Sequence, residues 1–336
     1  MIRKGERNLI TDVAGLTVGQ AEDIAARTGV TVVLGDEAMM AAADVRGGAP
    51  GTRGVLGLDS VPLVERVDAV VLSGGSAFGL DAPSGVEAFL RRQERGFRIA
   101  PGVPPVPIVA GAIIFDLANG GDKEWGTDPP YRLLGRRAAE NASLDFALGN
   151  AGAGLGATAG AYKGGLGSAS SVTDEGFTVG ALVVVNSVGS PVMPGTDVFW
   201  AWPFEQDGEF GGRVPRAPAA AALDFPPDMK GAARAGANTT VATVATDVEL
   251  ATLELRRIAI MAHDGFARAL RPVHTAFDGD LVTAVSTGRR QLTGPRAIAV
   301  TLLGHMAADC LARAVARGIY EAASLGPFRS YRDTFP

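Results

Sequence analysis

The sequence has 336 residues, of which 47% are hydrophobic and 6% aromatic, and it carries a formal net charge of −5. This length and apolar content are enough for a large buried core, so we expect a globular protein of one large domain or two modest ones. The charge includes no basic block and aromatic residues are few, which argues against nucleic acid or an anionic membrane as the main partner. The most apolar runs have the length of strands and are too short to span a bilayer.

The N-terminal sequence MIRKGERNLI has no apolar segment like that of a secretory signal. The single cysteine, Cys310, allows no intrachain disulfide. We therefore expect a cytoplasmic protein. Cys310 lies in a helical-looking run, where a small buried core residue is a far more common role than a catalytic thiol.

Short runs of β-branched or apolar residues alternate with longer runs of helical periodicity. In chain order, we expect strands at residues 30–34, 69–72, 108–115, 177–185, 239–246 and 281–285, and helices at 82–95, 251–270 and 297–324. Strands and helices mixed along the whole length predict an α/β or α+β layered domain. The segment 191–235 breaks this pattern with many prolines, so we expect a long mobile loop there.

The first glycine-rich stretch is SGGSAFGLD, residues 73–81. It invites comparison with the G-x-S-x-G turn that exposes a nucleophilic serine, but Phe78 stands where the second glycine should be. The three histidines have no recognisable relation to Ser76 in the sequence. A tight turn that faces a ligand is therefore a better interpretation than a catalytic Ser76.

The second stretch, GNAGAGLGATAG at residues 149–160, contains part of a dinucleotide-binding motif. Such a motif must open a helix, whereas here the glycines continue through residues 163–167, so close approach of backbones is the better interpretation. Asp278-Gly279-Asp280 lacks the other ligands of a calcium loop, and the sequence has no His-x-x-x-His and no paired cysteines. We expect neither a metal nor a cofactor.

Residues 236–247, GANTTVATVATD, place an Asn-Thr-Thr step at the head of a predicted strand. The β-branched residues from Thr239 to Thr246 favour the pleated conformation. The preceding residues, GAARAG at 231–236, are small apart from Arg234. The hydroxyl of Thr239 thus lies where a flexible segment is expected to meet the predicted strand.

Six stretches in this order resemble the DmpA-like family of N-terminal nucleophile hydrolases: ADVRGGAPGTR (43–53), VVLSGGSAFGLDAPSGVEAFL (70–90), GAGLGATAGAYKGGLGSAS (152–170), VGALVVVNSVG (179–189), NTTVATVATD (238–247) and HTAFDGD (274–280). The family includes L-aminopeptidase/D-esterases, β-peptidyl aminopeptidases and 6-aminohexanoate oligomer hydrolases. The resemblance covers nearly the whole chain except the Pro-rich segment. It implies one domain over residues 1–336 with the αββα sandwich of the family, which is shared with ornithine acetyltransferase.

Members of this family are made as inactive precursors that cut themselves. By resemblance, the cut falls between Asn238 and Thr239 and gives an α chain of residues 1–238 and a β chain of residues 239–336. Thr239 is then the nucleophile. A threonine hydroxyl needs a base to activate it, and the new α-amino group, with a reference pKa of about 7.7–8.0, suits that role near neutral pH.

The resemblance also implies roles for four other residues. Asn186 matches the family asparagine that stabilises the oxyanion, although alone it would be an ordinary residue at a strand end. Lys163 matches the family lysine near the nucleophile, although an exposed loop lysine is the usual case. Asp278 and Asp280 match the two polar residues that position the nucleophile and its amine. Alternation along a strand would put both on one face, whereas without the resemblance DGD would be read as a turn.

Two departures bear on the substrate. The aminopeptidases use Ser as nucleophile with Ser and Glu as the downstream pair, whereas Thr239, Asp278 and Asp280 match the 6-aminohexanoate oligomer hydrolases. Many relatives also have a tyrosine where this chain has Phe115. Phe115, Tyr162 and Ser76 are therefore candidate substrate-binding residues, with Tyr131 as another possible replacement for the missing tyrosine.

The resemblance leaves several functions open. The first is an amidase acting on linear oligoamides, and the second is an aminopeptidase, esterase or β-peptidase acting on small peptides. An acyltransferase like ornithine acetyltransferase is a third, and a nucleotide-binding module is the last. The family also implies a homo-oligomer, a tetramer or larger, of αβ units.

Overall fold

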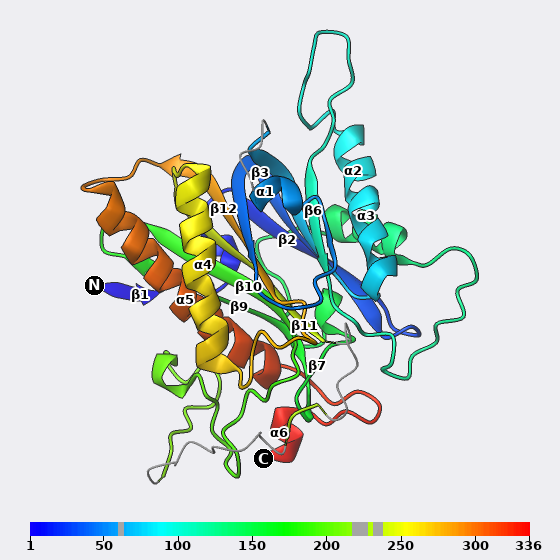
Figure 1. Cartoon of the computed structure of the whole chain (residues 1–336), viewed down its shortest axis with the longest axis vertical. Coiled ribbons are helices and arrows are strands. Elements are labelled where there is room, and N and C mark those ends of the chain that lie inside the picture. The colour runs from blue at the N-terminus through cyan, green and yellow to red at the C-terminus, as the bar shows by residue number, and fades with distance from the viewer. Residues whose placement is uncertain (60–63, 217–227, 231–237) are drawn as a thin grey trace.

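The computed structural model describes residues 1–59, 64–216, 228–230 and 238–336 (Figure 1). The strands are β1 (Ile2–Lys4), β2 (Leu16–Asp23), β3 (Thr28–Val45), β4 (Thr52–Arg53), β5 (Arg66–Ser73), β6 (Val109–Ile113), β7 (Thr158–Ala159), β8 (Tyr162–Lys163), β9 (Gly165–Thr173), β10 (Thr178–Asn186), β11 (Thr239–Val248) and β12 (Leu281–Arg290). The helices are α1 (Leu56–Asp59), α2 (Ala82–Arg92), α3 (Tyr131–Glu140), α4 (Thr252–Ala269), α5 (Arg296–Tyr320) and α6 (Tyr331–Thr334).

The main sheet has the order β1-β9-β10-β11-β12-β3-β5-β6-β4, and β2 also pairs with β3. Strand β3 joins the two halves of this sheet. Its first part, residues 28–35, pairs with β2, whereas its last part, residues 40–45, pairs with β12. Strand β11 lies between β10, to which it is antiparallel, and β12, to which it is parallel.

Three buried apolar clusters define the layers. One lies between helices α4 and α5 and the half of the sheet formed by β9 to β12. Another lies between α2 and α3 and the half that contains β2, β3, β5 and β6, and the third lies between the two halves. Figure 1 shows the two helix pairs on opposite sides of the strands. The predicted αββα layered fold is confirmed.

Helix α5 is long and apolar enough to cross a membrane, but most of it is buried against β9, β10 and α4, as in a core helix. Cys310 on this helix is completely buried, and burial raises the pKa of its thiol to about 11. Its predicted role as a core residue is confirmed.

All the strands and helices expected from periodicity are present, but several elements were not predicted, and the longest of these are β2, β9 and α3. Strand β9 escaped notice because it begins GLG, which is unusual in a strand. These glycines face helix α5. A Cβ atom on Gly167 would lie 1.9 Å from Ala314 O, and one on Gly165 would lie 2.3 Å from Gly318 O. The glycine-rich stretch therefore does provide close approach of backbones, between a strand and a helix.

Of the Pro-rich segment 191–235, the structure describes residues 191–216 and 228–230. The first part has little regular structure, yet it buries Val192, Phe199 and Phe210 in the cluster beneath α4 and α5. Phe199 stacks on Tyr331 with 4.2 Å between ring centroids. The expected mobility of residues 217–227 and 231–235 falls outside the described residues.

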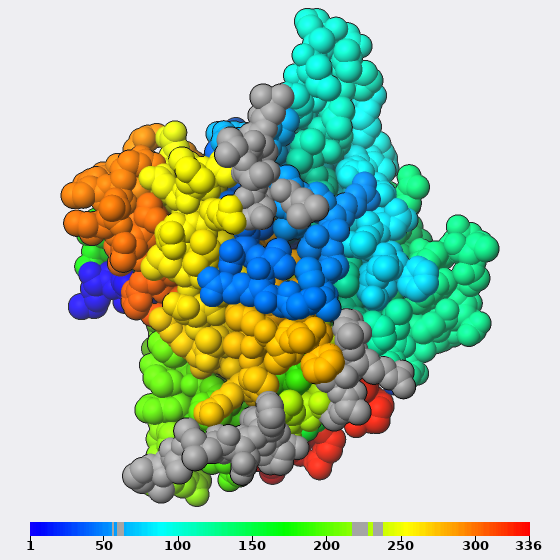
Figure 2. Space-filling model, in the orientation of Figure 1, coloured from blue at the N-terminus to red at the C-terminus, as the bar shows by residue number. Residues whose placement is uncertain are grey.

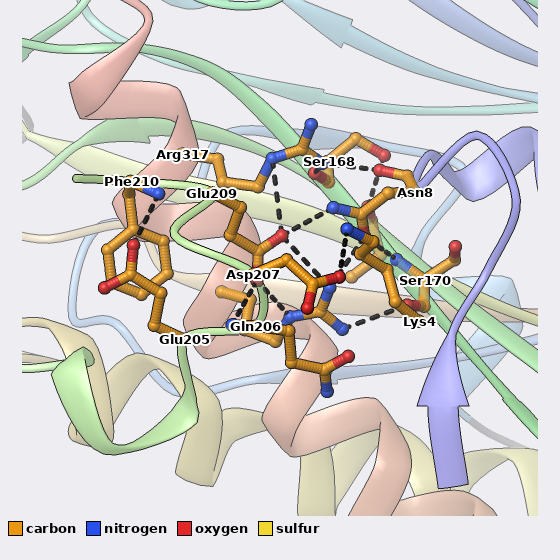
Figure 3. Close-up of polar contacts among 12 residues, drawn as sticks. Lys4, Asn8, Ser168, Ser170, Glu205, Gln206, Asp207, Glu209, Phe210 and Arg317 are labelled. Atoms are coloured by element: carbon orange, nitrogen blue, oxygen red, sulfur yellow. Dashed lines mark hydrogen bonds and ion pairs between the residues drawn. The ribbon is translucent and has the colours of Figure 1, made fainter. Parts of the chain in front are cut away.

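A buried ion pair fixes this segment to helix α5 through Glu209, which Figure 3 shows among its polar neighbours Asn8 and Arg317. Arg313, which is completely buried, donates to Glu209 Oε1 at 2.6 Å and to Glu209 Oε2 at 3.0 Å. It also donates to Ser170 O and Asn8 Oδ1, and Asn8 Nδ2 donates to Glu209 Oε2. Arg317 lies next to the same carboxylate, at 3.6 Å. The contact thus joins α5 to the N-terminal segment, β9 and the first part of the Pro-rich segment.

We expect Arg313→Met to lower the free energy of unfolding by about 3–5 kcal/mol, because it leaves the buried Glu209 carboxylate without its main partner. Urea denaturation followed by circular dichroism would measure this change. Arg332→Met is the matched control, since Arg332 is half-exposed and its ion-pair contact with Glu321 is 4.0 Å long. Similar losses in the two variants would contradict the prediction.

Candidate active site at the Asn238–Thr239 step

The head of β11 is enclosed by the two strands beside it. Thr239, its first residue, is 1% exposed. Across the antiparallel ladder it pairs directly with Asn186, the last residue of β10. On the other side, Asn238 forms a bridge with Asp278. The fold therefore brings together three motifs that are far apart in the sequence.

The hydroxyl of Thr239 lies against the carbonyl group of the residue before it. Thr239 Oγ1 donates to Asn238 O at 2.5 Å, and Gly279 N donates to the same oxygen at 3.0 Å. A Cβ atom on Gly279 would lie 2.7 Å from Thr239 Oγ1, so only glycine fits here without displacement. The Gly279 N–H can stabilise a negative charge on the Asn238 oxygen.

Asn186 is held by hydrogen bonds at both ends of its amide. Its Oδ1 accepts from Thr158 N at 3.1 Å and from Lys230 Nζ at 3.0 Å. Its Nδ2 donates one hydrogen to Phe115 O at 3.2 Å. Phe115 thus meets the site through its backbone carbonyl. The second hydrogen on Nδ2 has no protein acceptor among the hydrogen bonds of the described residues, so it is available to an oxyanion.

Lys163 is 1% exposed and is therefore not the exposed loop lysine that residue statistics favour. Its Nζ donates to Gly154 O and Ala157 O at 2.9 Å and to Gly164 O at 2.8 Å. Three acceptors fit the three hydrogens of the ammonium form. Burial lowers the pKa of Lys163 to about 7, an effect that the charge of Asp116 opposes. The lysine fixes the glycine-rich turn beside Asn186 and, in its ammonium form, places a positive charge there.

Asp278 and Asp280 precede β12, which begins at Leu281, so the prediction that they lie within a strand is wrong. Asp278 accepts from Thr275 N at 3.0 Å, Thr275 Oγ1 at 2.6 Å and Val188 N at 3.3 Å. Asp280 Oδ1 accepts from Thr240 N at 2.7 Å and thereby fixes the residue after the candidate nucleophile. Burial, and then the charge of Asp280, raise the pKa of Asp278.

The backbone of residues 46–49 supports this aspartate loop. The N–H groups of Arg46 and Gly47 donate to Asp280 O, and that of Ala49 donates to Asp278 O. A Cβ atom on Gly47 would lie 2.2 Å from Asp280 N. The RGGA stretch therefore needs glycine so that two backbones can lie in contact.

Two residues near the site were missed. Lys230 donates to Asn186 Oδ1, and desolvation of its ammonium group lowers its pKa to about 7 while the charge of Asp278 opposes this. No sequence pattern distinguishes Lys230 from a loop lysine. His274 bonds to Asp280 Oδ2 through Nδ1 at 2.9 Å. The HTAFDGD stretch contained His274, so its spacing of six residues from Asp280 was a usable signal.

The remaining candidates lie around this centre. Ser76 has a φ of +52° and its N–H donates to Ile114 O, next to Phe115 in the chain. Tyr162 is buried against Phe335, and burial raises its pKa to about 12. Tyr131 is completely buried on α3. Within the described part of the chain, neither tyrosine forms a hydrogen bond with Asn186 or Thr239.

Comparison with known proteins gives consistent results. Residues 8–331 match the family described as Peptidase family S58. An uncharacterized aminopeptidase of Mycobacterium tuberculosis is 43% identical over 98% of both chains. A 6-aminohexanoate-oligomer endohydrolase of Paenarthrobacter ureafaciens is 30% identical over 93% of this chain and 86% of its own.

A solved structure supports the fold. The L-aminopeptidase D-Ala-esterase/amidase of Ochrobactrum anthropi, described as a variant of the Ntn hydrolase fold, superposes with a TM-score of 0.69. The alignment covers 96% of this chain and 89% of the other at 20% identity.

Proposed function

The chain belongs to peptidase family S58, and we propose that it is an amide hydrolase that cuts itself between Asn238 and Thr239 and then uses Thr239 as its N-terminal nucleophile. The observation that carries this proposal is the contact of the Thr239 hydroxyl with the Asn238 carbonyl, whose oxygen also accepts from Gly279 N. A nucleophile, its target and an oxyanion donor are thus adjacent in the uncut chain.

In the first step, Thr239 Oγ attacks the carbonyl carbon of Asn238 and gives up its proton to a base. Negative charge develops on Asn238 O, where the Gly279 N–H stabilises it. The Asn238–Thr239 C–N bond then breaks, the Thr239 nitrogen takes a proton, and an ester to Oγ remains. Hydrolysis of this ester yields the Asn238 carboxylate and a free Thr239 hydroxyl and α-amine.

Turnover repeats this chemistry on a substrate amide. The α-amino group of Thr239 serves as the base, since its reference pKa of about 7.7–8.0 leaves an appreciable share of it neutral at physiological pH. The positive charge of Lys163 favours that neutral form. The acyl group passes to Thr239 Oγ, the amine product leaves, and water releases the acid.

Intact-mass measurement of the purified protein tests the self-cleavage. We expect two fragments, residues 1–238 and 239–336, with Thr239 at the new N-terminus. A single full-length chain that persists after prolonged incubation would overturn the proposal. The Glu209–Arg313 ion pair joins the two proposed chains across the cut, so we expect them to remain associated under native conditions.

For the substrate, we propose linear oligoamides such as 6-aminohexanoate oligomers, because Thr239, Asp278 and Asp280 match the residues of that branch. An aminopeptidase acting on small peptides is the second candidate, and the 43% identity to a mycobacterial protein named an aminopeptidase favours it. Parallel assays with aminohexanoate oligomers and L-alanine p-nitroanilide distinguish the two. Adding an amine acceptor and measuring acyl transfer distinguishes both from an acyltransferase.

We also propose a homo-oligomer of αβ units, by resemblance to the family.

We expect Lys230→Met to slow self-cleavage by about a hundredfold, the size of a general-base contribution. The α-amine that serves as base in turnover does not exist before the cut. Lys230, whose pKa burial lowers to about 7, bonds to Asn186, the partner of Thr239 in the ladder. The conversion of full-length chain to fragments after synthesis in a cell-free system would be timed by electrophoresis.

The control for this experiment is Lys4→Met, because Lys4 pairs with an exposed aspartate, Asp207, and is far from the cut in the sequence. Wild-type processing of Lys230→Met would exclude a role for Lys230 in the first step.

A further inference from the structure

A pair of histidines lies behind Asp280. His274, in the loop before β12, bonds to Asp280 Oδ2 through both its Nδ1, at 2.9 Å, and its backbone N–H, at 3.1 Å. His274 Nε2 lies 3.2 Å from Nδ1 of His263, which is on α4 and is 1% exposed. His263 Nε2 in turn lies 3.0 Å from Asp44 O, at the end of β3. We call His263 and His274 the histidine pair.

The histidine pair connects separate segments, since His263 lies on α4, His274 lies in the loop that follows it, and His263 contacts Asp44 at the end of β3. On the face shown in Figure 2, helix α4 (yellow) and the residues that follow it (gold) adjoin the segment after β3 (blue). His274 has a φ of +55°, which is uncommon for a residue with a side chain. The two hydrogen bonds of His274 to Asp280 hold the residue in this conformation.

The hydrogen-bond acceptors determine which ring nitrogens of His263 and His274 carry hydrogen. A backbone carbonyl can only accept, so His263 Nε2 carries a hydrogen that it donates to Asp44 O. Burial lowers the pKa of His263 to about 4, so at neutral pH this ring is neutral and its Nδ1 has a lone pair. Nδ1 therefore accepts from His274 Nε2, which must carry a hydrogen.

One proton remains to be placed, between His274 Nδ1 and Asp280 Oδ2. Asp280 also accepts N–H groups from Thr240 and from the backbone of His274. Hydrogen bonds of this kind favour the ionised form of a carboxyl group. The hydrogen bond therefore runs from His274 Nδ1 to the carboxylate, and the ring donates through both of its nitrogens.

We propose that His274 is a positioning residue for the nucleophile, because its ring holds the Asp280 carboxylate through Oδ2 in the orientation in which Oδ1 accepts from Thr240 N. This inference rests on the proposed role of Thr239. The carboxyl groups of Asp278 and Asp280 are only two residues apart, and one positive neighbour on Asp280 makes their environments unequal. Unequal environments of this kind allow one carboxyl group of a pair to stay ionised while the other holds a proton.

Other charges near the histidine pair could contribute to its protonation. The groups that act on His263 or Asp278 are Asp44 at the end of β3, Arg46 just after this strand, the two aspartates themselves, and Lys230. The hydrogen bond from the His274 ring brings its Nδ1 to within 2.9 Å of Asp280 Oδ2. A substitution of His274 therefore removes the nearest of these effects and leaves the others in place.

The first test is the pH dependence of kcat/KM for His274→Gln, which can still donate a hydrogen bond but carries no charge. Without the charge, the hydrogen bond that holds Asp280 Oδ2 is weaker. We expect the acidic limb of the profile to move upward, with kcat reduced and KM little changed. His305→Gln is the matched control, since His305 is half-exposed on α5. A His274→Gln profile that coincides with that of the wild type would overturn the proposal.

The second test uses the wild-type protein and needs neither activity nor a folded variant. The ¹⁵N shifts of its three histidines report how many ring nitrogens carry hydrogen. We expect two protonated nitrogens on His274 and one on His263 at pH 7. A single protonated nitrogen on His274 would overturn the proposal even if Thr239 is the nucleophile. Conversely, an active Thr239 variant would remove the proposed function, whereas these shifts would still establish where the protons are.

Discussion

Thr239→Val is expected to yield one uncut chain of 336 residues with no measurable amide hydrolysis. Valine keeps the β-branched shape that the head of β11 needs and removes only the hydroxyl. That hydroxyl lies 2.5 Å from the carbonyl oxygen of the bond to be cut. Without it neither self-cleavage nor the acyl-enzyme can form, so both activities should be lost together. Intact-mass measurement and an amidase assay on the same preparation check both.

The next residue provides the control. Thr240 is also completely buried at the head of β11, and its hydroxyl has no hydrogen-bond partner among the described residues. We expect Thr240→Val to be cut and active, because its backbone N–H to Asp280 is unchanged. Hydrolysis by Thr239→Val, or equal loss in both variants, would remove Thr239 as the nucleophile.

Local sequence was sufficient to predict the elements that carry the site. The β-branched run after Asn238 predicts β11, and the helical periodicity of residues 251–270 predicts α4. Strand β9 and helix α3 were missed for different reasons. Strand β9 begins with glycines that serve packing against α5, and α3 is a short helix, Tyr131–Glu140, preceded by two prolines and rich in arginine.

The chemistry of the site depended on contacts that no local pattern encodes. The Gly279 N–H donates to Asn238 O because β11 and β12 pair in parallel and bring these two segments side by side. Lys230 donates to Asn186, which lies 44 residues earlier in the sequence. His274 lay within a recognised stretch, but its partner His263 lies on a helix eleven residues earlier. Resemblance to a family gave the identities of Lys163 and Asn186, whereas their hydrogen bonds required the three-dimensional structure.

The different surroundings of Asn186 and Gly279 suggest that they serve different oxyanions. Gly279 N donates to the carbonyl oxygen of the bond proposed to be cut during maturation. Asn186 Nδ2 donates one hydrogen to Phe115 O, and its other hydrogen has no acceptor within the described part of the chain. We therefore expect Asn186 to stabilise the oxyanion of an incoming substrate, and Gly279 to act first on that of the precursor.

Asn186→Asp should accordingly reduce kcat for amide hydrolysis by about 10²–10³-fold, the usual cost of losing one oxyanion donor. Aspartate has the same shape and retains acceptors for Thr158 N and Lys230 Nζ, but it cannot donate to an oxyanion. Asn141→Asp is the control, because Asn141 is exposed at the end of α3. Single-turnover measurements on fully cut protein separate turnover from maturation. If Asn186→Asp hydrolysed substrate at the wild-type rate, the donor would have to come from Gly279 alone.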